Sequence, residues 1–138
     1  RRVFLSPLGM PCIQPPWGKL VAMDLRAGKI LWDEPLGTIE DVAPAPVPNF
    51  KWGVPNMGGA ILTASGLVII GSAADYYLRI FDVNNGQELW QARLPTAAHA
   101  TPATFKIDDK QYIVVAVGGH SEFGSPPGDH LMAWRLKD

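Results

Sequence analysis

The stretch AMDLRAGKILW at residues 22–32 returns in altered form as IFDVNNGQELW at residues 80–90. In both copies an aspartate is followed four residues later by glycine and eight residues later by tryptophan. Glycine late in a turn adopts the left-handed backbone geometry that joins adjacent antiparallel strands. The repeat therefore predicts two β-hairpins of the same design.

The repeated aspartate and tryptophan have predicted structural tasks. Asp24 and Asp82 end their strands, where a carboxylate can accept hydrogen bonds from the N–H groups of the turn. Trp32 and Trp90 follow on the outer strand of each hairpin. There an indole ring can lie flat against a neighbouring sheet and bury up to about 150–250 Å². We expect these tryptophans to dock one sheet on another and to take no part in catalysis.

The rest of the chain also has the pattern of β-structure. Short runs of β-branched and aromatic residues alternate with Gly, Pro and Asn, and no segment has a helical apolar period. Strands are expected at residues 19–24, 30–33, 59–63, 67–72, 77–82, 88–93, 102–107, 111–117 and 130–136. The fold class is therefore all-β.

A repeat on a longer scale favours a β-propeller. The strand LVAMD at 20–24 returns as LRIFD at 78–82 and, more weakly, as LMAWR at 131–135, at offsets of 58 and 53 residues. Such offsets suit four-stranded propeller blades whose loops add to the usual period.

The strands divide into about two blades. They comprise the outer half of one blade at 19–33, a full blade at 59–94 and three strands of another at 100–136. Propellers close with about four to eight blades, and two would leave long sheet edges exposed. The chain is therefore expected to be a fragment of a larger propeller, or a subunit that completes one.

Composition excludes several functions. With 12 Lys and Arg against 13 Asp and Glu, the chain has no basic surplus for nucleic acid. Its longest apolar stretch, GLVIIGSAA at 66–74, is shorter than the roughly 18–20 residues that span a bilayer. Cys12 is the single cysteine, so neither an internal disulfide nor a cysteine metal cluster can form.

Four longer segments resemble a known family. They are GMPCIQPPWGKLVAMDLRAGKILWDEPLGT (9–38), WGVPNMGGAILTASGLV (52–68), YLRIFDVNNGQELWQARLP (77–95) and DDKQYIVVAVGGHSEFGSPPGDHLMAWRL (108–136). Together they resemble the C-terminal region of the membrane-bound dehydrogenases that depend on pyrroloquinoline quinone (PQQ). The resemblance is greatest to the glucose dehydrogenase branch, and the quinate/shikimate branch is a near relative. The motifs PPWG, NMGG and GGH, in this order, are its specific features.

The resemblance implies an eight-bladed propeller on the periplasmic side of the bacterial inner membrane, anchored by an N-terminal membrane domain. It also implies PQQ on the propeller axis with Ca²⁺ or Mg²⁺, oxidation of a sugar or polyol by hydride transfer to PQQ, and ubiquinone as electron acceptor. The family's catalytic aspartate and metal ligands would lie upstream. No catalytic residue or metal ligand is therefore assigned here, and the chain alone, without the remaining blades, is expected to be inactive.

Two motifs hold the site residues that the resemblance implies. Met57 matches a family position that packs against the flat PQQ ring, with Asn56 beside it, and Gly58 and Gly59 would let the backbone approach the cofactor. His120 matches a histidine that influences substrate choice and could hydrogen-bond to a sugar hydroxyl. The structural alternatives are Met57 as a core residue and His120 as a residue that stabilises its loop.

Other conspicuous residues have expected structural roles. His99, at a strand entry, is expected to serve the fold, and His130 is expected to be exposed at the start of the last strand. The proline-rich segment EDVAPAPVPNFKWGVPN (40–56) is either a cover for the active site or a stiff loop between blades, and the second interpretation is favoured. The sequence indicates no partner for Glu40 or Asp41.

Two other function classes compete with the dehydrogenase. A propeller scaffold without cofactor would have no reason to keep NMGG and GGH at the inner mouth, and its exposed loops should be richer in charge. A metal-dependent hydrolase is disfavoured because the sequence shows no clustered His, Asp and Glu and no nucleophile motif. The sequence therefore favours part of an enzyme.

Overall fold

Three antiparallel sheets joined by long loops make up the computed structural model, which describes residues 4–135. The first sheet has the order β1-β2, the second β3-β4-β5-β6 and the third β7-β8-β9. The strands are β1 (Lys19–Asp24), β2 (Lys29–Pro35), β3 (Ile61–Leu62), β4 (Leu67–Ile70), β5 (Tyr77–Asp82), β6 (Glu88–Arg93), β7 (Ala103–Ile107), β8 (Lys110–Val117) and β9 (His130–Arg135). A single 3-10 turn, η1 (Ser121–Phe123), is the one helical element among these residues.

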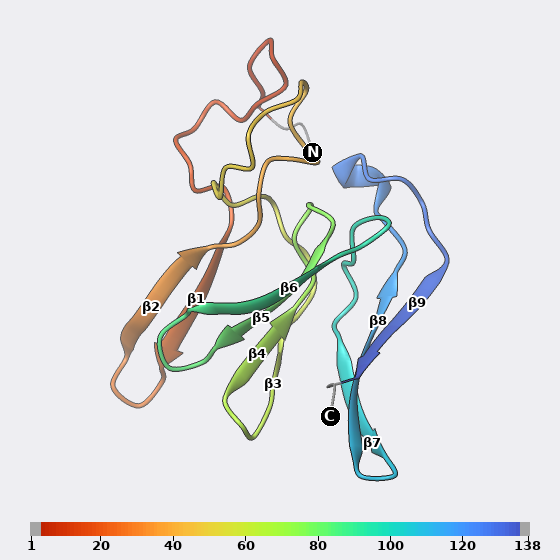
Figure 1. Cartoon of the computed structure of the whole chain (residues 1–138). Coiled ribbons are helices and arrows are strands. Elements are labelled where there is room, and N and C mark those ends of the chain that lie inside the picture. Colours follow the sequence, from red (N-terminus) through yellow and green to blue (C-terminus); the bar gives the residue numbers. More distant parts are fainter. Residues whose placement is uncertain (1–3, 136–138) are drawn as a thin grey trace.

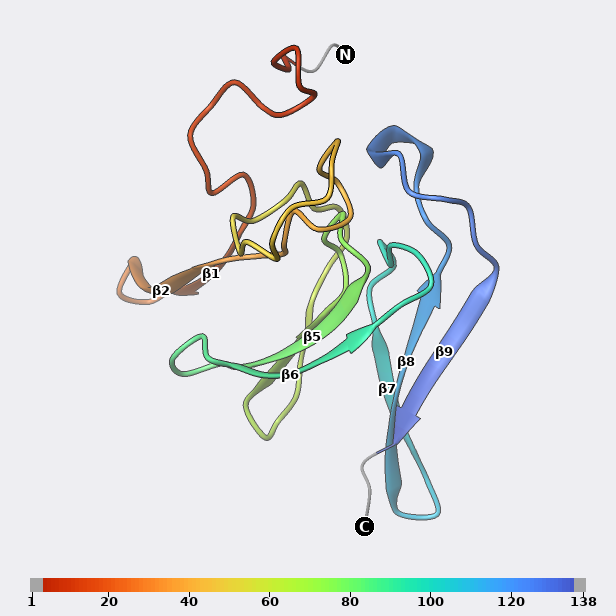
Figure 2. The same ribbon diagram turned by 45° about the horizontal axis from the view of Figure 1, so that its top comes forward.

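The sheets lie side by side and fan out from one another (Figures 1 and 2). The tight turns between β1 and β2, β3 and β4, and β7 and β8 lie at the lower end in Figure 1. The longer loops 36–60, 94–102 and 118–129 gather at the upper end, so segments that are distant in sequence meet there. Among the described residues, no helix has the length and apolar character needed to cross a membrane.

The two repeated hairpins are built alike. The carboxylate of Asp24 accepts hydrogen bonds from two backbone N–H groups of its turn at 2.9 and 3.1 Å. That of Asp82 accepts one at 2.7 Å. Gly28 and Gly86 have φ of +64° and +73°, in the region that favours glycine. Both hairpins also carry a register shift at the same place in the repeat. The predicted turn geometry is confirmed.

Trp32 and Trp90 dock differently. Trp32 of β2 donates a hydrogen bond from Nε1 to the carbonyl of Val83 at 2.8 Å, and its ring lies over Gly86. Trp90 of β6 is 38% exposed and meets Trp134 of β9 edge-on, at 6.1 Å and 79°. The prediction that Trp90 lies flat against the neighbouring sheet is therefore wrong, because within residues 4–135 its ring meets Trp134 edge-on.

β3 is shorter than the sequence indicates. A strand was expected over 59–63, whereas the ladder holds only Ile61–Leu62. The N–H of Gly59 instead donates to Oγ1 of Thr101, at 3.1 Å, which directs that group to the next sheet. Segment 56–59 therefore leaves the sheet and joins the loops at the upper end.

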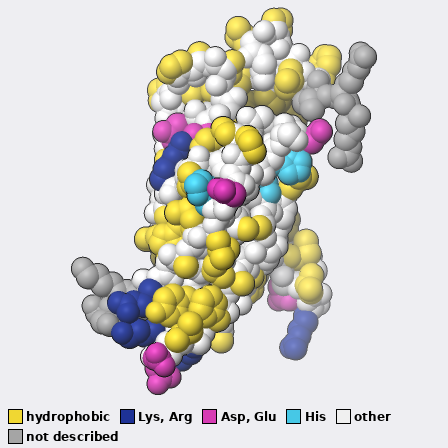
Figure 3. Space-filling model, turned by 90° about the vertical axis from the view of Figure 1, so that its right-hand side faces the viewer, with side chains coloured by type: hydrophobic (Ala, Val, Ile, Leu, Met, Phe, Trp, Pro, Cys, Tyr) yellow, Lys and Arg dark blue, Asp and Glu magenta, His cyan; other side chains and the backbone are white. Residues whose placement is uncertain are grey.

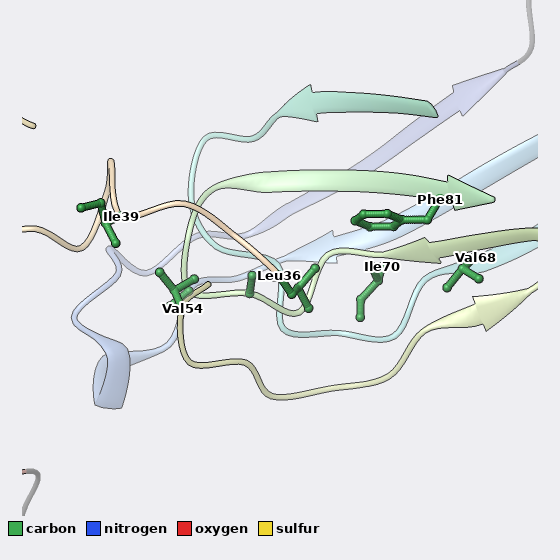
Figure 4. Close-up of a cluster of buried hydrophobic side chains, with 8 residues drawn as sticks. Leu36, Ile39, Val54, Val68, Ile70 and Phe81 are labelled. Atoms are coloured by element: carbon green, nitrogen blue, oxygen red, sulfur yellow. The ribbon is translucent and has the colours of Figure 1, made fainter. Parts of the chain in front are cut away.

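The loop 36–60, which contains the proline-rich segment 40–56, is part of the hydrophobic core (Figure 4). Its side chains pack on the second sheet in a cluster that includes Leu36, Ile39, Val54, Val68, Ile70 and Phe81. Leu36, Ile39 and Val54 of the loop are each no more than 2% exposed. Burying three such side chains stabilises the loop by several kcal/mol, at about 1.5–3 kcal/mol each. The interpretation of this segment as a loop between blades agrees with this packing.

A buried ion pair holds the start of that loop. Asp75 and Arg79 have side chains that are 0% and 2% exposed, and Arg79 Nη1 donates to Asp75 Oδ1 at 2.9 Å. Asp75 Oδ2 also accepts from the backbone N–H of Thr38 at 2.8 Å. On the other side of Arg79, Glu88 pairs with Lys51 at 3.0 Å. The loop is thus tied to the second sheet at two points.

A second cluster gives partners to the two acidic residues of this loop. Arg93 binds Asp41 with both of its terminal nitrogens, one at 2.6 Å. Its guanidinium also lies over the rings of Tyr77 and Tyr76, at 4.8 and 5.1 Å. The hydroxyl of Tyr77 donates to Glu40 at 3.2 Å. Burial, and secondly the Asp41 carboxylate, raise the pKa of Tyr76. The loop therefore has a third anchor.

Candidate functional site

The segment that contains Met57 lies at the upper end of the second sheet. Asn56 forms an isolated β-bridge with Ala73, and the N–H of Met57 donates to the carbonyl of Ser72 at 2.9 Å. These bonds fix the backbone, while the Met57 side chain is 41% exposed. Met57 is therefore not a core residue in this structure. Its thioether is free to contact a planar group from solvent.

Gly58 is needed for a contact within the protein. It has φ of +109°, and a Cβ atom there would lie 2.1 Å from the carbonyl oxygen of His99. No side chain could occupy that space without moving backbone. The structure thus explains this glycine by the close approach of segment 56–58 to His99, and the predicted approach to a cofactor stays a prediction.

His120 stands in a loop with its own internal support. It caps η1, accepting a hydrogen bond at Nδ1 from the N–H of Glu122 at 3.3 Å. Its N–H donates to the hydroxyl of Ser125 at 2.7 Å, and the N–H of Gly119 donates to the carbonyl of Ala97 at 3.0 Å. His120 therefore contributes to loop structure, and its half-buried ring still reaches the surface.

His99 connects the two predicted parts of the site. Its ring centroid lies 5.0 Å from that of Phe123, nearly parallel at 24°, and 5.5 Å from that of His120. Both ring nitrogens of His99 are buried, as is the hydroxyl of Ser72, and none of these atoms has a hydrogen-bond partner among the described residues. Burial lowers the pKa of His99, so its ring is neutral at neutral pH. Met57 and His120 are thus joined through His99.

The remaining predicted residues lie apart from this cluster. His130 is exposed at the start of β9, as expected. Cys12 is exposed and is a free thiol. Within residues 4–135, no group of three or more His, Cys, Asp or Glu is arranged to hold a metal ion. Histidine and acidic side chains are visible on the face shown in Figure 3, among many uncharged residues.

A separate apolar hollow lies between the second and third sheets. Its volume is about 460 Å³, and its lining includes Ile69, Ile80, Trp90, Ile113 and Trp134. None of the predicted site residues lines it. It lies at the contact between the second and third sheets, where Trp90 meets Trp134 edge-on.

Sequence reasoning placed neither His99 nor Ser72 beside the predicted site residues. A signal was present in the repeat, because His99 stands four residues before β7 as Met57 stands four residues before β3. Similarly, Ser72 and His120 both follow the second strand of their sheets, β4 and β8. Ser72 follows β4 by two residues and His120 follows β8 by three, so the same ends of consecutive sheets supply the cluster.

Comparison with known proteins places this geometry in a family. The PQQ family model, described as the glucose/ethanol/alcohol dehydrogenase β-propeller domain, matches residues 1–113. The chain belongs to this family. The resemblance found from the sequence motifs is therefore confirmed, and so is the all-β propeller fragment.

Individual relatives support the same assignment. Quinoprotein glucose dehydrogenase A of Acinetobacter calcoaceticus is 47% identical over 137 residues, which cover 98% of this chain and 17% of the relative. A quinate/shikimate dehydrogenase (quinone) of Acinetobacter baylyi is 41% identical over 140 residues, covering 97% of this chain and 17% of the relative. The chain therefore spans about 17% of the length of these relatives.

A solved structure shows the same fold. A quinohemoprotein alcohol dehydrogenase from Pseudomonas putida matches with a TM-score of 0.64 over 86% of this chain and 16% of its own. The sequence identity is 23%, so this likeness speaks for the fold alone.

Proposed function

We propose that this chain is the C-terminal part of the eight-bladed propeller of a PQQ-dependent dehydrogenase that oxidises a sugar. Glucose is the favoured substrate. Its strands would form a partial blade at 19–33, a full blade at 59–94 and a partial blade at 100–136. The observation that carries the proposal is the meeting of segments 56–58 and 118–125 at one end of the sheets, through His99. Family membership and the 47% identical glucose dehydrogenase support it.

The described residues fit one side of a site for a flat cofactor. Met57 offers an exposed, polarisable thioether on a fixed backbone, and the exposed amide of Asn56 stands beside it. Bound PQQ would supply the hydride-accepting chemistry. His120 would orient the substrate by a hydrogen bond from Nε2–H to a hydroxyl oxygen, since its Nδ1 already accepts from the N–H of Glu122. The catalytic base and the ligands of Ca²⁺ or Mg²⁺ would come from other parts of the full-length chain.

The partners and location follow from the same proposal. The remaining blades would cover the open edges of the three sheets, and ubiquinone would accept the electrons through a membrane domain. The propeller would stand on the periplasmic side of the inner membrane. The neutral charge balance of this chain gives no support to a nucleic-acid partner.

A quinate or shikimate dehydrogenase is the alternative within the family. The 41% identical quinate/shikimate enzyme motivates it, because its identity to this chain is only slightly lower. A propeller scaffold without cofactor has less support, since an exposed methionine on a fixed backbone would then have no ligand.

The test is a substrate profile of the full-length protein, freed of cofactor and then reloaded with PQQ and Ca²⁺. Dye reduction should depend on added PQQ and should be faster with glucose than with quinate. His120→Ala should change the ratio of kcat/KM values between aldoses, and His130→Ala, which alters an exposed histidine, should not. Faster turnover of quinate would favour the alternative, and the absence of any PQQ-dependent reduction would contradict both.

A further inference from the structure

The contacts of His99 divide into two sets on opposite parts of the same residue. Its backbone carbonyl meets Gly58, where even a Cβ atom would be 2.1 Å away. The flat side of its ring lies against Phe123, at 5.0 Å between centroids, and near His120, at 5.5 Å. A single residue thus touches both the segment with the predicted cofactor contact and the loop with the predicted substrate contact.

The ring nitrogens of His99 are buried and make no hydrogen bond with the described residues. A Cβ atom at Gly58 would lie 2.1 Å from the His99 carbonyl oxygen and 3.2 Å from Cβ of Ser72, so His99, Ser72 and segment 56–58 lie together. The backbone of Met57 and of Ser72 also raises the pKa of His99 and partly offsets the larger, opposite effect of burial. Neither nitrogen reaches hydrogen-bond geometry with the described residues, nor does the buried hydroxyl of Ser72. Buried polar atoms without partners are rare in native proteins, and each one calls for an explanation such as an ordered water, an ion or a functional role.

The position of His99 in the repeat supports the same view. His99 and Met57 stand at equivalent distances before the first strands of consecutive sheets. A propeller places equivalent residues of neighbouring blades at the same height around the axis. His99 is therefore expected at the same end of the propeller axis as Met57.

We propose that His99 is a positioning residue that couples the cofactor segment 56–58 to the substrate loop 118–125. Its ring face packs against Phe123 in the loop of His120, and its backbone carbonyl contacts Gly58 beside Met57. Its two buried ring nitrogens are available to a polar group that fills the site. This inference rests on the proposed function, because it assigns the two segments to cofactor and substrate.

The roles of the ring face and of the ring nitrogens can be separated by two substitutions at His99. His99→Phe keeps a ring for the contact with Phe123 and removes both nitrogens. His99→Gln keeps a hydrogen-bonding group of similar reach and removes the ring. His130→Gln, at an exposed histidine, is the matched control.

The experiment uses the full-length protein and three readouts. PQQ affinity is measured by equilibrium dialysis of the cofactor-free protein with Ca²⁺, and KM and kcat for glucose are measured on the reloaded enzyme. The third readout is the rate of cleavage by a glutamate-specific protease after Glu122, an exposed residue within the substrate loop, in the cofactor-free protein.

The two variants should give opposite results. His99→Gln should raise the KM for glucose and the cleavage rate by about fivefold, the scale of one lost aromatic contact, and leave PQQ affinity within about twofold. His99→Phe should weaken PQQ binding by about fivefold, the scale of one hydrogen bond, and leave KM and cleavage within about twofold. In His99→Gln, kcat should change less than the KM for glucose, and in His99→Phe it should change less than the affinity for PQQ. His130→Gln should match the wild type in all three readouts.

Unchanged values in both variants would overturn the proposal, as would an equal loss of all three properties, which would indicate a structural role only. The cleavage readout needs neither cofactor nor substrate. If the wild-type protein bound no PQQ, the proposed function would fail, and the ratio of cleavage rates between the two variants would still decide whether the His99 ring holds the loop.

Discussion

Replacement of Gly86 by alanine tests the docking of one sheet on the next. At this glycine a Cβ atom would lie 2.7 Å from Cε3 and 2.8 Å from Cδ2 of Trp32, and the backbone has φ of +73°. The left-handed conformation costs an alanine about 1 kcal/mol, and overpacking against a seated ring costs about 1–3 kcal/mol more. Gly86→Ala should therefore lower the free energy of unfolding by about 2–4 kcal/mol.

The repeat provides a matched control. Gly28 holds the same place in the first hairpin, with φ of +64°, but none of the atoms of residues 4–135 lies within 4 Å of an added Cβ. Gly28→Ala should thus cost only the backbone share, about 1 kcal/mol. The assay is urea unfolding of the 138-residue chain, in which no preceding blade covers Gly28, followed by tryptophan fluorescence. Trp32→Phe serves as a background in which part of the Gly86→Ala loss should be recovered. Equal losses for the two glycines would refute the docking of Trp32.

Two further predictions concern buried ionisable groups. Asp75→Asn should lower the free energy of unfolding by about 3–5 kcal/mol, because it leaves the buried charge of Arg79 without its partner. Asp33→Asn, in an exposed pair, should cost less than about 1 kcal/mol. Similar losses for the two variants in urea unfolding would contradict this. His99 has a lowered pKa in the folded protein, so the unfolded chain binds a proton first, and stability should fall as pH drops below about 6.5. His99→Gln should reduce the slope of stability between pH 7 and 5, and an unaltered slope would show that the ring is not held neutral.

The hairpins were predictable because their determinants are local. Within eleven residues, the aspartate marks the turn, the glycine marks the position of positive φ, and the tryptophan marks the outer strand. The same signal cannot show what the tryptophan meets, since that depends on the neighbouring sheet. Trp32 finds a glycine turn there, whereas Trp90 finds the edge of Trp134.

The loop contacts were not predictable because they join residues distant in sequence. Asp41 and Arg93 are separated by 52 residues, and nothing near either of them indicates the other. The predicted site was more accessible, since Met57 and His120 lie in recognisable motifs. His99 was assigned to the fold alone, although its place before β7 repeats that of Met57 before β3. Comparing the repeats would have shown that His99 and Met57 hold equivalent positions.

The most direct test of the central claim, that the Met57 end of this chain holds PQQ, is equilibrium dialysis of the cofactor-free, full-length protein with PQQ and Ca²⁺. Met57→Ala should raise the Kd about three- to tenfold, which lies within the range of a lost sulfur–ring contact. Met23→Ala, which removes a thioether that is 51% exposed on β1, should leave the Kd unchanged. Equal Kd values for the wild type and both variants would contradict the account.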